Sequence, residues 1–385
     1  MSPLIGAHVT SATRVVPRGR KPQELLPTGA PLTLVDAEGR TVPSAGLAMP
    51  GDEALLALHR KMVLARRFDT QATALTRQGR LAVYPSARGQ EASEVGAVLA
   101  LRPQDWLFPT YRDTMAVVCR GLDPVEVLSL LRGDWHCGYD PYEYRVAPQC
   151  TPLATNTLHA VGVAHAAKLK GEDTVALVML GDGATSEGDT HAALNFAAVW
   201  QAPVVFFVQN NGYAISVPLS KQTAAPSLAH KGVGYGVPAM LVDGNDAAAV
   251  YAAVRGAVAS GAEGGGPTLI EALTYRIEAH TNADDATRYR DQAEVDGWLA
   301  RDPLARLRKH LTARGLLDEP AVAALEAEAE AEAAALRQRV NADIAHDPAD
   351  LFRHVYAEQT PDLRWQQQEL SAELAAAADD PEAAR

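Results

Sequence analysis

Two uninterrupted apolar segments restrict the folds open to this chain more than any other feature of its 385 residues. One is Thr174-Val-Ala-Leu-Val-Met-Leu180, and the other is Pro203-Val-Val-Phe-Phe-Val208. Runs of this kind are typical of strands that are buried on both faces of a parallel sheet. Apolar side chains recur at helical spacing between Ala192 and Val199, so the region is predicted to be a strand–turn–helix–strand unit.

Polar residues follow both predicted strands where each strand ends. Gly181-Asp182-Gly183 follows the first strand, and Asn210-Asn211 follows the second. Ligands bind at the carboxyl ends of parallel strands, and a glycine lets the backbone approach a phosphate closely. Asp182, the Asn211 side chain and a nearby carbonyl could complete the oxygen shell of Mg²⁺ together with diphosphate oxygens and water. The two strings therefore predict a cradle for a magnesium diphosphate.

Two simpler interpretations compete with this cradle. Gly181-x-Gly183 followed by Gly188 could be a dinucleotide fingerprint, but the spacing differs and Gln209-Asn210-Asn211 offers no acidic ribose ligand. The other is purely structural, a turn glycine and a capping asparagine. Either string alone leaves these interpretations open, whereas both strings at matching strand ends favour the cradle.

The rest of the chain alternates between helical and extended patterns, which indicates an α/β fold. Helices are predicted from Asp52, as cap, to about Gln78 and over 89–101, 123–131, 156–170 and 246–260, and further strands over 239–242 and 268–274. This order predicts three α/β/α layers around a mainly parallel sheet. Residues 321–340, rich in Ala and Glu, are predicted to form a solvated helix without chemistry. We expect an N-terminal arm with a short hairpin (1–51), one α/β domain (52–350) and a tail that packs on a partner or is disordered (351–385).

Composition excludes several classes of protein. A net charge of −12 argues against nucleic acid as the main partner, and no apolar run is long enough to span a bilayer. Three cysteines without metal-like spacing favour a reducing compartment. The first 23 residues are basic and contain no acid, but prolines interrupt them. A flexible arm on a bacterial cytoplasmic protein is favoured over a mitochondrial transit peptide.

Further motifs in a fixed order identify a family resemblance. They are Pro109-Thr-Tyr-Arg-Asp113, Pro152-Leu-Ala-Thr155, Val242-Asp-Gly-Asn-Asp246, Glu271 through His280 to Arg290, and the run from Gly181 to Ser216. With them the chain resembles, over roughly residues 52 to 370, the alpha subunits of thiamine-diphosphate-dependent 2-oxo acid dehydrogenases. These subunits belong to the decarboxylating component of the branched-chain and pyruvate complexes.

The resemblance implies a set of site residues. For Mg²⁺ the implied ligands are Asp182, Asn211 and the Tyr213 carbonyl. For thiamine diphosphate the implied contacts are Tyr111, Arg112, Gly183, Ala184, Arg276 and His280 near the diphosphate, and Thr151 and Leu153 near the aminopyrimidine. His280 and His136 are implied to manage protons near the acyl-transfer step. Structural interpretations compete with these roles: a surface ion pair for Arg112, a solvated loop residue for His280 and a packed histidine for His136.

Several positions depart from the family pattern. Cys150 and Asn156 replace a hydroxyl and a longer amide around the turn where branched-chain members hold K⁺, and a thiol is a poor ligand for a hard cation. Gln209 replaces a basic residue beside the asparagine pair. The sequence therefore does not decide whether this turn binds K⁺.

The resemblance also implies a partner and a reaction. The glutamate that activates the cofactor lies on a beta subunit in two-chain members, and this chain has no room for a second α/β domain. We expect an α2β2 heterotetramer that serves a lipoylated dihydrolipoamide acyltransferase core, decarboxylating a 2-oxo acid and transferring the acyl group to lipoyl. Residues 152–155 and 242–246 resemble branched-chain subunits, which favours 3-methyl-2-oxobutanoate, whereas 76–80 and 132–150 resemble pyruvate-type subunits. A transketolase-like single chain and a non-catalytic scaffold are the remaining alternatives.

Overall fold

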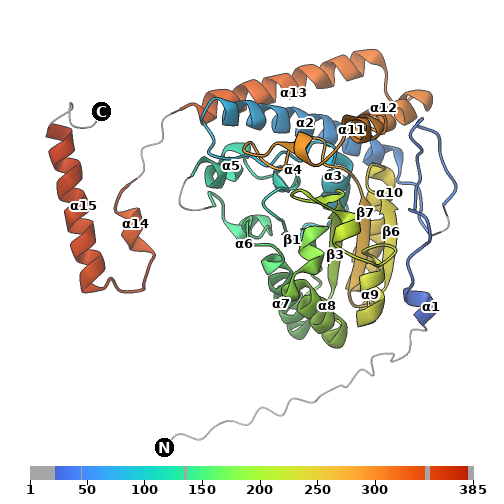
Figure 1. The fold of residues 1–385 in the computed structure, drawn as a ribbon, viewed down its shortest axis with the longest axis horizontal. Coiled ribbons are helices and arrows are strands. Elements are labelled where there is room, and N and C mark those ends of the chain that lie inside the picture. Colours follow the sequence, from blue (N-terminus) through green and yellow to red (C-terminus); the bar gives the residue numbers. More distant parts are fainter. Residues whose placement is uncertain (1–21, 45, 134–136, 343–346, 380–385) are drawn as a thin grey trace, which may run out of the picture.

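The structure is a computed structural model that describes residues 22–44, 46–133, 137–342 and 347–379. In this part of the chain, five parallel strands form one sheet in the order β1-β2-β3-β7-β6 (Figure 1). The strands are β1 (Trp106–Phe108), β2 (Ala176–Gly181), β3 (Val204–Asn210), β6 (Ala239–Asp243) and β7 (Thr268–Leu273). A small hairpin of β4 (Tyr213–Ala214) and β5 (Val217–Pro218) follows β3. The predictions for the basic N-terminal segment concern residues outside the described ranges, apart from its last two.

Helices occupy most of the remaining described residues. They are α1 (Pro22–Leu25), α2 (Asp52–Arg77), α3 (Glu91–Leu99), α4 (Thr114–Cys119), α5 (Pro124–Arg132), α6 (Pro141–Tyr144), α7 (Thr155–Lys170), α8 (Gly188–Trp200), α9 (His230–Tyr235), α10 (Ala247–Ala262), α11 (Gln292–Leu299), α12 (Pro303–Ala313), α13 (Glu319–Val340), α14 (Asp350–Arg353) and α15 (Pro361–Asp379). Short 3₁₀ turns are η1 (Gly183–Ser186), η2 (Leu219–Lys221) and η3 (Ala286–Arg288).

Side chains alternate along the central strands between two helical layers. Leu177 and Phe207 belong to the core that β2 and β3 share with α2, α3, α4 and α10. Val178 and Phe206 belong to the core shared with α7 and α8. Each of these strands is buried on both faces, which is why its sequence is an unbroken apolar run. The predicted three-layer α/β/α class is confirmed.

Aspartates start several of the helices. Asp123, Asp302 and Asp318 accept hydrogen bonds from backbone N–H groups at the beginning of α5, α12 and α13, and each helix has proline in its first turn. The prediction that Asp52 caps α2 is wrong. Gly51 is the cap residue and Asp52 is the first helical residue, where its carboxylate contacts Arg314 at 2.7 Å.

The segment before α2 is attached to the far edge of the sheet. Val35 and Thr41 form the antiparallel bridge of the predicted hairpin, and Leu32 pairs in parallel with Val242 of β6. The Asp246 carboxylate accepts hydrogen bonds from the backbone N–H groups of Leu34 and Val35 at 2.6 and 2.7 Å. The same carboxylate caps α10, so one buried side chain ties the hairpin to the sheet.

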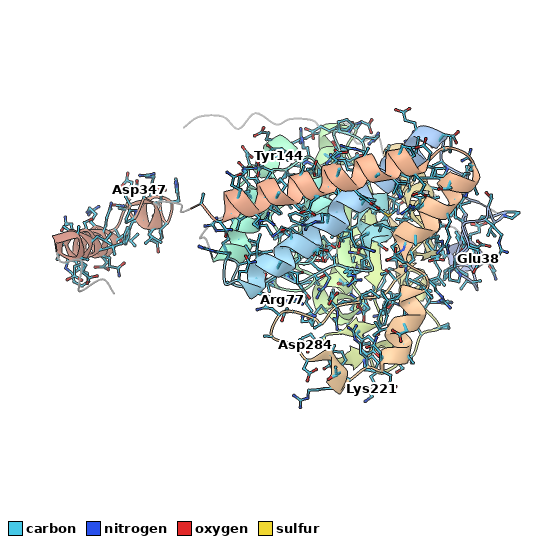
Figure 2. The ribbon with its side chains drawn as sticks, turned by 90° about the horizontal axis from the view of Figure 1, so that it is seen from above. Glu38, Arg77, Tyr144, Lys221, Asp284 and Asp347 are labelled. Carbon is cyan, nitrogen blue, oxygen red and sulfur yellow. The ribbon has the colours of Figure 1, made fainter. Side chains whose placement is uncertain are left out.

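Helix α13 is not the solvated helix that its composition predicts. It lies along α2, as Figure 2 shows, and buries one row of side chains against the molecule. The row consists of Val322, Ala329, Ala333, Leu336 and Val340. The prediction failed because two members of the row, Ala329 and Ala333, are alanines like many exposed residues of the same helix, which hides the helical periodicity.

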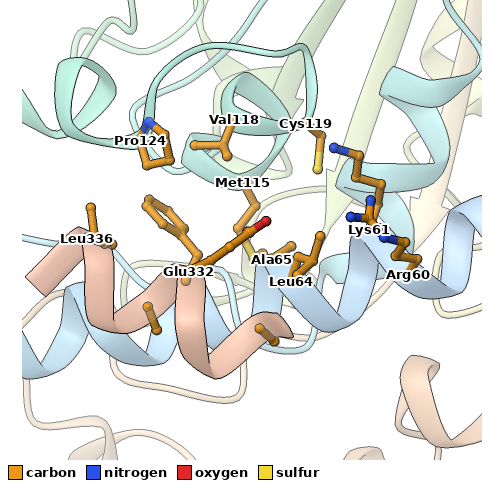
Figure 3. Close-up of a pocket in the computed structure, with 13 residues that line it drawn as sticks. Arg60, Lys61, Leu64, Ala65, Met115, Val118, Cys119, Pro124, Glu332 and Leu336 are labelled. Carbon is orange, nitrogen blue, oxygen red and sulfur yellow. The ribbon is translucent and has the colours of Figure 1, made fainter. Parts of the chain in front are cut away.

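A crevice of about 110 Å³ opens where α13 crosses α2 and α4 (Figure 3). It is mainly apolar, with Lys61, Cys119 and Glu332 among its lining residues, and it shares none with the site described below. All three cysteines are free thiols, and burial raises the pKa of Cys119 to about 12. No helix in the described ranges combines the length and apolarity needed to cross a membrane.

The packing of α13 can be tested with two substitutions on the same helix. Ala333 is buried and Ala331 is exposed. We expect Ala333→Glu to lower the free energy of unfolding by about 2 kcal/mol or more, because it buries an unpaired charge. Ala331→Glu should change it by less than about 0.5 kcal/mol. Equal effects of the two substitutions in denaturant titrations would mean that α13 is a solvated helix, as the sequence predicted.

Candidate active site

The register between β2 and β3 brings the two polar strings together. Gly181 pairs with Gln209, so Asp182 and Asn211 both leave the sheet at its carboxyl edge. A hollow of about 220 Å³ lies at this edge, bounded also by the loops that follow β1 and β7. It is the position at which a doubly wound sheet binds its ligand.

Most residues predicted for the site line this hollow. They are Tyr111, Arg112, Leu153, Asp182, Gly183, Ala184, Asn211, Tyr213, Arg276 and His280. Thr151 is exposed and lies outside the lining. His136 belongs to a segment outside the described residues.

Asp182 is a buried carboxylate with a neutral partner. Its Oδ2 accepts a hydrogen bond of 2.5 Å from the Gln222 amide, and its side chain is almost fully inaccessible. Burial raises the pKa of Asp182, while the hydrogen bond from Gln222 opposes this rise. No group of three or more His, Cys, Asp or Glu side chains gathers among the described residues as a metal site. A cation here would therefore depend on Asp182, amide or carbonyl oxygens and the oxygens of a ligand.

The hairpin geometry leaves the Tyr213 carbonyl available. Ala214 pairs with Val217 to close the two-residue loop, and Leu219 N–H donates to the Gly212 carbonyl at 3.0 Å. Tyr213 therefore occupies the non-hydrogen-bonded position of the hairpin, where the carbonyl points away from the partner strand. Its own N–H donates to Asn211 Oδ1 at 3.3 Å, so the hairpin places a free carbonyl beside the asparagine.

Two buried guanidinium groups give the hollow a positive wall. Arg112 donates to the Ser86 and His280 carbonyls at 2.8 and 3.1 Å. Arg276 donates to the Ile215 carbonyl at 2.8 Å, and its Nε finds no partner in the described part of the chain. Neither guanidinium forms an ion pair with a described carboxylate, although their residues are only 6% and 1% exposed. Buried charges without counter-ions are costly, and a dianionic diphosphate fits both of them.

His280 lies between these two arginines and is held neutral. Its Nδ1 faces Arg112 Nη2 at 3.0 Å and Arg276 Nη1 at 3.1 Å. Burial and the two positive charges lower the pKa of His280 to about 4. Because guanidinium groups can only donate, Nδ1 must accept and the proton must reside on Nε2. His280 therefore offers a single neutral N–H donor.

Close packing and backbone strain shape the rim next to the 3₁₀ turn. A Cβ on Gly183 would lie 2.7 Å from the Cβ of Ala214, so only glycine fits there. Ile215 adopts φ of 57°, which is uncommon for a β-branched residue, and Arg276 binds its carbonyl. Strain of this kind is found at ligand sites, and it presents a half-exposed isoleucine to the hollow.

Sequence reasoning did not single out Gln90, Glu187, Ile215 and Gln222, which also contribute to the site. Glu187 lies within the recognised motif, whereas nothing in the sequence near Gln90 or Gln222 signals a contact across the fold. The Asn156 amide nitrogen, near the suggested K⁺ position, donates to carbonyls that include Met179 O at 2.9 Å. That amide thus cross-links β1 and β2 to α7.

The fold and the site are those of a diphosphate-binding α/β enzyme subunit, and comparison with known proteins names the family. Residues 59–349 match the family model described as dehydrogenase E1 component, and the chain belongs to this family. It is 50% identical over 324 residues to the 3-methyl-2-oxobutanoate dehydrogenase subunit alpha of Mycobacterium tuberculosis, covering 84% of this chain and 88% of that protein. It is 41% identical over 287 residues to the pyruvate dehydrogenase E1 component subunit alpha of Staphylococcus aureus, covering 74% and 78%. The family predicted from the motifs is confirmed.

The depressed pKa of His280 predicts a pH effect on stability. Between its ordinary pKa of 6.5 and about 4, the unfolded state binds the proton and the folded state does not. Protonation therefore favours the unfolded state in this range, and the free energy of unfolding falls as the pH is lowered from about 6.5 toward 4. In thermal unfolding without cofactor, the unsubstituted protein should lose stability over this range relative to His280→Gln. His354→Gln, at an exposed histidine, is the control. A constant difference between the unsubstituted protein and His280→Gln would mean that His280 titrates normally.

Proposed function

We propose that this chain is the alpha subunit of a branched-chain 2-oxo acid dehydrogenase that acts on 3-methyl-2-oxobutanoate with thiamine diphosphate and Mg²⁺. One observation carries the proposal. Two buried arginines without carboxylate partners face a hollow that also contains Asp182 and Asn211, at the carboxyl edge of the sheet. This wall suits a dianion bound through a hard cation. Family membership and the 50% identity to a subunit of that name support the substrate.

The chain's own residues have separate roles in holding the cofactor. Asp182 Oδ, Asn211 Oδ1 and the Tyr213 carbonyl would supply oxygens to Mg²⁺. Arg112 and Arg276 would neutralise the diphosphate, which also gives the unpartnered Arg276 Nε an acceptor. Gly183 and Ala184 would bring the backbone close to the same group. When bound, thiamine diphosphate supplies the carbon nucleophile and the electron sink for decarboxylation.

His280 acts in this proposal as a fixed hydrogen-bond donor. Its Nδ1 is committed to the two guanidinium groups, so Nε2–H is free to donate to an oxygen of the cofactor or of the reacting acid. A neutral imidazole can donate this hydrogen bond without a change in its protonation state. The His280 backbone N–H donates to the Asp284 carboxylate at 2.7 Å, which holds the backbone that carries the ring. Leu153 and Ile215, which are 44% and 56% exposed, leave apolar surface at the rim for an aliphatic chain.

The proposal includes partners that complete the site. A beta subunit would cover the hollow and contribute the activating glutamate, in an α2β2 assembly serving a lipoylated acyltransferase core in the bacterial cytoplasm. Both relatives compared above are alpha subunits, which supports such a partner. The C-terminal helices α14 and α15 are drawn beyond α13 in Figure 1. Exposed Tyr356, between the two helices, and exposed Trp365, on α15, would pack on the beta subunit.

The metal assignment predicts the effect of one substitution. Asp182→Asn keeps the shape of the side chain but removes a carboxylate ligand from a site with few protein oxygens. We expect the affinity for thiamine diphosphate with Mg²⁺ to fall at least about tenfold, or about 1.4 kcal/mol. Calorimetry on the co-expressed αβ protein measures this, and an unchanged affinity would reject the assignment. Asp189→Asn, an exposed acid of the same motif, is the matched control.

The substrate is tested with the assembled αβ enzyme and a panel of 2-oxo acids. 3-Methyl-2-oxobutanoate should give a higher kcat/KM than pyruvate, though by a limited margin, since apolar pockets discriminate by only about 1 to 3 kcal/mol per methylene. The isolated chain should be inactive even when it is saturated with cofactor and Mg²⁺. A tenfold preference for pyruvate would assign the chain to a pyruvate complex. Turnover by the purified single chain would refute the need for a beta subunit.

A further inference from the structure

A row of side-chain hydrogen bonds runs along the floor of the site, from Asn211 to Asp113. Asn211 Nδ2 donates to Gln90 Oε1 at 3.0 Å, Gln90 Nε2 donates to Gln209 Oε1 at 3.0 Å, and Gln209 Nε2 donates to Asp113 Oδ1 at 2.5 Å. All four residues are at most 6% exposed. They come from the start of α3, the end of β3, the loop that follows it and the start of α4.

Asp113, at the end of this row of hydrogen bonds, decides the direction of each bond in it. An ionised carboxylate can only accept, so Gln209 must turn its NH₂ toward Asp113 and its oxygen toward Gln90. Gln90 must then donate to Gln209 and accept from Asn211. The NH₂ of Asn211 donates to Gln90, so its Oδ1 is the atom that accepts from the Tyr213 N–H and can face the hollow that Asn211 lines. This matters because an amide NH₂ has no lone pair for a cation, whereas the amide oxygen does.

Asp113 is well suited to set this direction. Its Oδ2 accepts from both the N–H and the hydroxyl of Thr110 at 2.6 Å, so three donors surround the carboxylate. Burial raises the pKa of Asp113, and these donors together with Arg112 oppose the rise. The neighbouring Glu94 has its pKa raised well above the ordinary value by burial and by Asp113, and its Oε1 has no partner in the described structure. All three contacts of Asp113 come from donors, so the carboxylate is the acceptor at the end of this row of hydrogen bonds.

We propose that Asp113, Gln209 and Gln90 form a directional relay that positions Asn211 with its amide oxygen toward Mg²⁺. The relay rests on the proposed function, because it assigns residues to the metal site named there. Through Thr110, the same carboxylate holds the loop that carries Tyr111 and Arg112. Asp113 thus sets the geometry of the metal side and of the diphosphate side together. Gln90, Gln209 and Asp113 are positioning residues that do not touch the reacting atoms.

The test measures Mg²⁺ affinity rather than turnover. The αβ protein is saturated with thiamine diphosphate and titrated with Mg²⁺ in a calorimeter, using Gln90→Met and Gln209→Met, which keep the volume and remove the hydrogen bonds. Outer partners of metal ligands typically contribute about 10- to 100-fold in metal affinity, so each variant should bind Mg²⁺ at least about tenfold more weakly. Gln71→Met, at a buried glutamine of α2 outside the relay, should leave the affinity unchanged.

A conservative variant separates positioning from packing. In Gln90→Glu the protonated acid can donate to Gln209 and accept from Asn211, so affinity should stay within about threefold of the unsubstituted protein. If Gln90→Glu falls as far as Gln90→Met, or if Gln90→Met binds Mg²⁺ normally, the relay is refuted. Asp182→Asn in the same titration distinguishes a failure of the relay from a failure of the metal site that the relay serves. Weak binding by Asp182→Asn with normal binding by Gln90→Met overturns the relay alone, whereas normal binding by Asp182→Asn overturns the metal site itself.

Discussion

The parallel register between β2 and β3 is the constraint on which the rest of this molecule depends. Leu177 and Phe207 are fixed in one helical core, while Val178 and Phe206 are fixed in the other. A slip of one residue would exchange the two sets of side chains between different helical layers, which the packing of both cores forbids. Packing far from any ligand therefore sets the positions at which Asp182 and its neighbours leave the sheet.

At that edge the molecule has a charge distribution that is unfavourable without a ligand. Arg112 and Arg276 are buried without a direct ion pair to a described carboxylate, although Asp113 lies beside Arg112, and Asp182 and Asp284 act on Arg276 from a greater distance. His280 between them is kept uncharged by burial and by their field. Such an arrangement lowers stability, because the two guanidinium groups lose hydration without a carboxylate in hydrogen-bond contact. An anionic cofactor offsets this cost and gains affinity from it. In the proposed relay, the direction of the amides that Asp113 sets would serve the same end on the metal side.

Contacts between distant parts of the chain hold the site together. Gln90 meets Gln209 across 119 positions of sequence, and Arg112 meets His280 across 168. These contacts involve the start of α3, the end of β3 and the loops after β1 and β7, which meet at one edge of the sheet. The rigid sheet and its two helical layers thereby position the loops that carry the chemistry. The hollow stays open at a rim of exposed apolar side chains, as expected for a site completed by another subunit.

The sequence by itself determined the fold class, the family and the two strand ends, because unbroken apolar runs and ordered motifs are local signals. It predicted α2, α7 and α10 closely, and the branched-chain preference it favoured agrees with the higher identity to that class of subunit. It failed for α13, where the buried Ala329 and Ala333 resemble the exposed alanines of the same helix. Only the tertiary structure decided the neutral tautomer of His280, the partner of Asp182 and the relay through Gln90. These depend on charges and hydrogen bonds between residues far apart in sequence, for which no local pattern exists.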